Sequence, residues 1–96
     1  MEKTLYSKDY QTLLALLREV RENANVTQIK IANTLGTTQT IVSKCERGER
    51  RLDVLELRQW CLALGIPFHL FLAEFDYRVA RASKEASQTE AMRSNP

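Results

Sequence analysis

Residues 27–48 read TQIKIANTLGTTQTIVSKCERG, and this stretch decides the fold. Thr27 is a helix-capping residue, and the apolar positions after it follow a helical spacing that stops before Gly36. Thr38 caps a second short helical segment, which Gly48 ends. Gly36 stands where the chain has to leave the first helix in a left-handed conformation. The stretch therefore predicts two short helices joined by a tight turn.

The inner face of this pair has to meet specific packing demands. Ala32 must be small, because the two helices cross there. Gly36 opens the turn, and Val42 and Cys45 fall on the buried side of the second helix. All four demands are met within one short window. Residues 28–47 are therefore predicted to form a helix-turn-helix.

The rest of the chain also has helical periodicity. One apolar stripe predicts a helix over residues 7–23. Asp53 and Glu56 have the spacing of a capping box at the start of a fourth helix. Pro67 fits the first turn of a fifth helix, which is expected to end near Arg81. No alternating strand pattern is present, so an all-α, five-helix fold is predicted.

The 96 residues allow a single domain. It is expected over residues 1–83, and the small polar residues of 84–96 predict a flexible or frayed tail. No run approaches the roughly 18 apolar residues of a membrane span, and the start has no secretion signal. Cys45 and Cys61 match no disulfide or metal-site pattern and are expected in the core. We expect a cytoplasmic protein with no metal and no cofactor.

The positive charge is concentrated in the middle of the chain. Residues 26–52 carry five basic and two acidic groups, a net charge of +3, whereas the remainder carries nine basic and ten acidic groups, a net charge of −1. A basic surface on a neutral body suits contact with phosphates. Taken alone, such a cluster is more often simply a solvated face.

Residues Leu13–Leu72 resemble the Cro/CI-type (XRE-like) helix-turn-helix domain of bacterial and phage regulators. The resemblance implies a lambda-repressor-like fold, with helices 2 and 3 as the helix-turn-helix and an extended fifth helix. It also implies that helix 3 lies in the major groove of a double-stranded DNA operator, which would place the protein at the nucleoid. The residues that carry it are Leu17-Arg18 with Arg21, Thr27-Gln28, Ile31-Ala32, Leu35-Gly36, Val42-Ser43-Lys44, Glu46-Arg47-Gly48 and Leu64-Gly65.

Helical geometry predicts which side chains of helix 3 face outward and could contact DNA bases: Gln39, Thr40, Ser43 and Lys44. The resemblance implies that Gln39 grips adenine through N6 and N7, and that Gln28 braces Gln39 while reaching a phosphate. It further implies an internal salt bridge between Arg21 and Glu46. Other phosphate contacts are expected from Thr38, Arg47, Arg50 and Arg51.

The fifth helix carries two apolar stripes. The first is expected to pack in the core and consists of Phe68, Phe71, Leu72, Phe75 and Val79. The second suggests a twofold dimer interface and consists of Leu70, Ala73, Tyr77 and Ala80. The alternative is that the second stripe packs on the first helix or on Leu5 and Tyr6.

Three functions are compatible with these features, and none is an enzyme, because no catalytic constellation is present. The favoured one is a dimeric repressor that binds a palindromic operator. The second is an antitoxin that binds its own promoter and neutralises a toxin partner through its C-terminal region. The third is an interaction module without DNA binding, against which the outward Gln39 and Lys44 argue.

Overall fold

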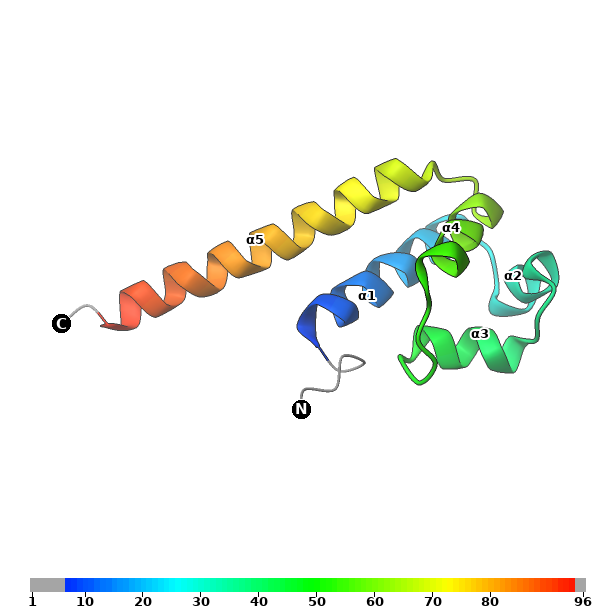
Figure 1. Ribbon diagram of the computed structural model, residues 1–96, viewed down its shortest axis with the longest axis horizontal. Coiled ribbons are helices and arrows are strands. Elements are labelled where there is room, and N and C mark those ends of the chain that lie inside the picture. Colours follow the sequence, from blue (N-terminus) through cyan, green and yellow to red (C-terminus); the bar gives the residue numbers. More distant parts are fainter. Residues whose placement is uncertain (1–6, 95–96) are drawn as a thin grey trace.

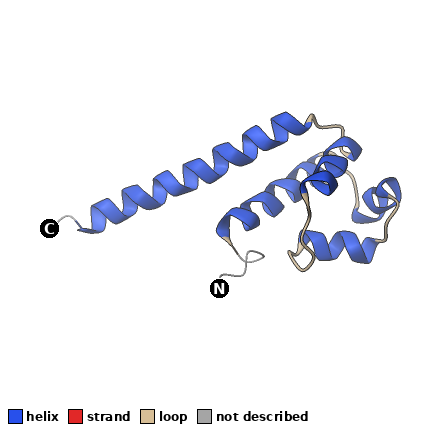
Figure 2. Cartoon of the chain, viewed as in Figure 1, coloured by secondary structure: helices blue, strands red, loops and turns tan. Residues whose placement is uncertain are grey.

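The computed structural model describes residues 7–94, and all regular structure in that range is helical (Figures 1 and 2). The predicted all-α, five-helix fold is confirmed. The five elements are α1 (Lys8–Asn23), α2 (Gln28–Leu35), α3 (Gln39–Glu46), α4 (Val54–Ala63) and α5 (Phe68–Ser94).

The helix boundaries come from local capping chemistry. The hydroxyls of Thr27 and Thr38 each accept a hydrogen bond from the backbone N–H three residues on. Asp53 and Glu56 form the predicted capping box at the start of α4. Gly36 ends α2 with φ 72° and ψ 32°. A Cβ there would meet nothing within 4 Å, so the backbone angle and not crowding favours glycine.

One hydrophobic core joins the helix-turn-helix to the other helices. Ala32, Val42 and Cys45 are at most 2% exposed, as their predicted inner positions require. Cys45 and Cys61 are free and buried. Burial raises the pKa of both thiols, that of Cys61 to about 11, so both stay protonated at neutral pH. Their role in this core is packing.

Helix α5 closes the core against α1 and α4. Phe71 is 3% exposed, and Phe68 and Phe75 pack partly buried beside it. Arg78 then ties α5 to α1 through an ion pair with Glu19 at 2.8 Å. Leu72 was expected in the core but is 37% exposed, because it lies too far around the helix from the Phe71 side. That expectation is corrected.

Helix α5 is longer than expected. It continues to Ser94 instead of ending near Arg81, and Figure 1 shows it extending past the start of α1. Residues 68–94 contain neither proline nor glycine and are rich in good helix formers, so nothing local stops the helix. The expected frayed tail is therefore helical as far as Ser94. Residues 95–96, like Leu5 and Tyr6, lie outside the described part of the chain.

Truncating Phe71 should destabilise the whole domain. Phe71→Ala is expected to lower the free energy of unfolding by about 3–5 kcal/mol, because it removes a buried ring and leaves a cavity. Leu55→Ala, at a residue that is 71% exposed, should change it by about 0.5 kcal/mol or less. Urea unfolding followed by circular dichroism measures both. Equal losses in the two variants would contradict the assignment of Phe71 to the core.

Candidate DNA-binding surface

The outer face of α3 is open to solvent. Gln39, Thr40 and Lys44 are exposed, whereas Ser43 is half-buried. The Ser43 hydroxyl accepts a hydrogen bond from the Arg47 guanidinium. Three of the four residues expected to face outward are therefore exposed, and the fourth, Ser43, is engaged within the protein.

A buried ion pair lies directly behind this face. Arg21 of α1 contacts Glu46 of α3 through two hydrogen bonds, Nε to Oε2 at 2.5 Å and Nη2 to Oε1 at 3.0 Å. The two side chains are only 8% and 3% exposed. Arg21 also donates from Nη1 to the Val26 carbonyl at 2.7 Å. The pair joins the first helix to the end of the third, in the arrangement that the resemblance implied.

Two glutamines extend this pair to the surface. Gln28 Nε2 donates to Glu46 Oε1 at 2.9 Å, and Gln39 Nε2 donates to Gln28 Oε1 at 3.3 Å. The resemblance implied the contact between Gln28 and Gln39 but not the bond from Gln28 to Glu46. No sequence signal marks that bond, because the two residues lie 18 positions apart.

The direction of these bonds follows from the chemistry of the groups. An ionised carboxylate only accepts, so the amide nitrogen of Gln28 must face Glu46. The amide oxygen of Gln28 is then left for Gln39, which has to donate to it. Gln39 keeps its own Oε1 and one N–H for an outside partner. That combination matches the N6 donor and the N7 acceptor of adenine.

The loop after α3 is held in place by α1. The Tyr10 hydroxyl accepts a hydrogen bond from the Leu52 backbone N–H at 3.0 Å. The guanidinium of Arg51 lies over the Tyr10 ring, 4.7 Å from its centroid. Sequence reasoning missed Tyr10, whose hydrogen-bond partner is 42 residues away. This contact gives the basic loop a defined position beside α3.

The other two arginines near this loop are paired with carboxylates. Arg47 contacts Glu49 at 2.7 Å, and Arg50 contacts Glu56 at 2.9 Å. The hydrogen bond from Arg47 holds the pKa of the Glu49 carboxyl below its usual value. These guanidinium groups are exposed, and each retains further N–H donors that could contact a phosphate. Their charge is nevertheless partly compensated, which the charge count of the sequence did not show.

The second stripe of α5 lies on the outside of the domain. Leu70 and Tyr77 are 55% and 58% exposed, and Ala73 and Ala80 are exposed with them. The stripe does not pack on α1, since all four side chains are open to solvent. By helical geometry opposite charges flank it, with Asp76 on one side and Arg81, which pairs with Glu85 at 3.2 Å, on the other.

No group of three or more potential metal ligands occurs among residues 7–85. In the part of the chain that the structure describes, no helix is long and apolar enough to cross a membrane.

Comparison with known proteins gives one family match and two similar solved structures. The helix-turn-helix family model matches residues 17–71. An XRE-family like protein from Pseudomonas syringae pv. tomato str. DC3000 is 40% identical, with a TM-score of 0.72, and the match covers 78% of this chain and 92% of that one. The clp gene regulator ClgR from Corynebacterium glutamicum is 23% identical, with a TM-score of 0.73 and coverage of 90% and 92%, and thus shares the fold. No curated protein matches the chain.

Breaking the buried pair should be costly, and replacing it should not be. Glu46→Leu leaves Arg21 buried without its partner and is expected to lower the free energy of unfolding by about 3–5 kcal/mol. The double variant Arg21→Met/Glu46→Leu should recover most of that loss, because two apolar side chains of similar volume pack in its place. Chemical denaturation measures both.

A matched control is the exposed pair formed by Arg18 and Glu22, whose side chains are 63% and 54% exposed. Arg18→Met/Glu22→Leu should change stability by about 1 kcal/mol or less. If Glu46→Leu were no more destabilising than this control, the buried pair would not have the structural role assigned to it.

Proposed function

The chain belongs to the XRE-type helix-turn-helix family of DNA-binding transcriptional regulators, and we propose that it acts as a sequence-specific repressor that binds a palindromic operator as a homodimer. The observation that carries the proposal is the oriented amide of Gln39. It is exposed at the start of α3 and held by Gln28, which is held in turn by Glu46. Such preorganisation is what reading a base edge requires.

In the proposed complex, α3 enters the major groove and its exposed side chains contact bases. Gln39 pairs with adenine. Lys44 donates to guanine O6 or N7, and Thr40 contacts a thymine methyl. Ser43 has a smaller part, because its hydroxyl already accepts a bond from Arg47.

The phosphate contacts are proposed for residues around the reading helix. Gln28 and Thr38 lie at the starts of α2 and α3, where helix N-termini favour an anion. Arg47, Arg50 and Arg51 lie on the loop that Tyr10 holds in place. These contacts set the register of the protein on DNA and add affinity without reading sequence.

The dimer is proposed to form through the second stripe of α5. Leu70, Ala73, Tyr77 and Ala80 recur at alternating spacings of three and four residues, as in a coiled-coil seam. In a parallel pair of α5 helices, Asp76 of one copy would lie near Arg81 of the other, so the flanking charges are complementary. A second copy of the chain thus covers the stripe and places two recognition helices on one operator.

The alternative function is that of an antitoxin, and the length of α5 supports this second candidate. The helix continues past the start of α1 to Ser94, which leaves a segment that could bind a partner protein (Figure 1). In that case the protein still binds its own promoter. A toxin encoded beside it and co-purifying with it in stoichiometric amount distinguishes this function from the plain repressor.

Selection of bound sequences from random DNA tests the main proposal, and two variants separate the expected roles. Lys44→Ala should cost about 1–3 kcal/mol at one half-site position and relax the base preference there. Arg50→Ala should weaken binding to all sequences alike and reduce the salt slope by about one. Uniform weakening by both variants would refute the assignment of Lys44 to base contact.

The dimer proposal predicts that Leu70→Asp/Tyr77→Asp is a folded monomer. Charges in the seam cannot be buried without partners, whereas the core side of α5 is untouched. Sedimentation should show half the mass of the wild type, with unchanged helical content and weaker operator binding. An unchanged sedimentation coefficient together with unchanged operator affinity would exclude this stripe as the interface.

A further inference from the structure

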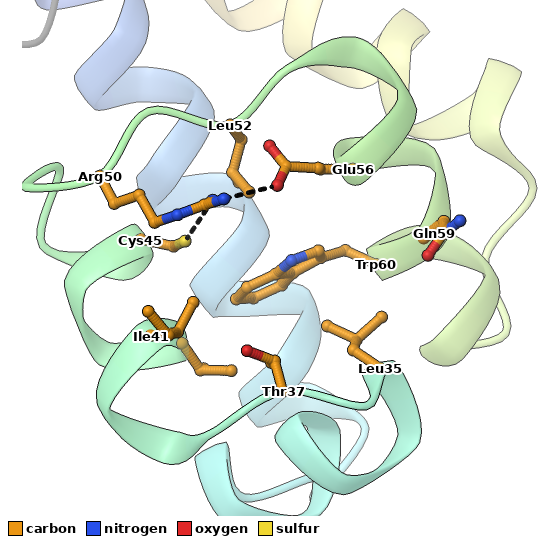
Figure 3. A pocket seen from close by; sticks show the side chains of 10 residues that line it. Leu35, Thr37, Ile41, Cys45, Arg50, Leu52, Glu56, Gln59 and Trp60 are labelled. Carbon is orange, nitrogen blue, oxygen red and sulfur yellow. Dashed lines mark hydrogen bonds and ion pairs between the residues drawn. The ribbon is translucent and has the colours of Figure 1, made fainter.

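A cavity of about 120 Å³ lies behind α3, between the turn that follows α2, the loop that follows α3, and α4. Leu35, Ile41 and Leu52 form apolar walls around the indole ring of Trp60 (Figure 3). Arg50 lies across one end, where it bridges Cys45 and Glu56. The cavity uses none of the four residues expected to read DNA bases.

Trp60 lines this cavity, and its indole N–H is an unused donor. Trp60 is 4% exposed. Its N–H makes no hydrogen bond to another described residue. In the same part of the chain, every fully buried side-chain nitrogen has a hydrogen-bond partner. The N–H therefore keeps some surface open to solvent, and Trp60 is one of the residues that line the cavity. A largely buried tryptophan usually has a partner for this group.

The polar end of the cavity carries no net charge. Arg50 Nη2 lies 2.9 Å from Glu56 Oε2, so the two charges compensate each other. An ion entering the apolar interior would lose its hydration and gain no unpaired counter-charge, which is unfavourable. The Glu56 carboxylate accepts bonds from Arg50 and from the Asp53 backbone N–H and still has lone pairs free. A neutral ligand with one donor is the better match.

We propose that this cavity binds a small neutral molecule that has a compact apolar body and a hydroxyl group. The apolar body lies against Ile41 and the face of the Trp60 ring. The hydroxyl oxygen accepts from the indole N–H, and the hydroxyl proton is donated to the Glu56 carboxylate. An apolar cavity of about 150 Å³ holds benzene, so a single small ring is the right size. The ligand contacts α3 from its core side, behind the face proposed to read DNA.

Cyclopentanol is a suitable probe, because it does not absorb light at the wavelengths that excite tryptophan. Trp60 is the only tryptophan of the chain, so the emission reports on this site. Titration of the full-length protein should shift the Trp60 emission saturably, with a dissociation constant on the order of 1 mM. Cyclopentane should bind roughly tenfold more weakly, because it lacks the hydrogen bond to a charged acceptor. Cyclopentanecarboxylate should give no saturable shift. The absence of a saturable shift with cyclopentanol, or equal affinity for all three probes, would overturn the proposal.

A pair of variants tests the location. Ile41→Phe places a larger side chain in the cavity and should abolish the response to cyclopentanol. Ile29→Phe makes the same change on α2, at a residue that is 57% exposed and does not line the cavity, and should respond like the wild type. A wild-type response from a folded Ile41→Phe variant would place the site elsewhere. None of these measurements uses DNA, so their failure would leave the proposed repressor function standing.

Discussion

The buried ion pair between Arg21 and Glu46 is the interaction on which the orientation of the exposed Gln39 amide depends. It joins α1 to the end of α3, and both side chains are almost fully buried. A buried pair contributes little net stability compared with apolar side chains of the same volume. The pair matters here because it orients a neighbouring side chain. The Glu46 carboxylate can only accept hydrogen bonds, so the Gln28 amide must turn its N–H group toward it.

Two side chains extend this orientation from the buried carboxylate to the surface. Gln28 is turned by Glu46, and Gln39 is turned by Gln28, so the amide that emerges at the surface presents a defined donor and a defined acceptor. An exposed glutamine would otherwise lose rotamer entropy on ordering against a base. The hydrophobic core supports the same geometry from below, since Ala32, Val42 and Cys45 hold α2 and α3 at a fixed separation.

Features that depend on residues close in sequence could be predicted, whereas contacts between residues far apart in sequence could not. The helix-turn-helix, its caps at Thr27 and Thr38, and the glycine at position 36 depend on neighbours within a few residues, so the sequence was sufficient for them. The bond from Gln28 to Glu46 and the anchor of Tyr10 on Leu52 join distant positions, and no periodic pattern marks them. The end of α5 differs from the prediction because the residues after Arg81 have no apolar stripe but remain good helix formers.

The most direct test of this account is the base preference of Arg21→Met/Glu46→Leu, measured by selection from random DNA beside the wild type. The double variant keeps the fold through apolar packing but removes the carboxylate that turns Gln28. We predict that it retains the preferences read by Lys44 and loses the adenine preference read by Gln39. An unchanged preference at every operator position would contradict the claim that the buried pair orients the reading amide.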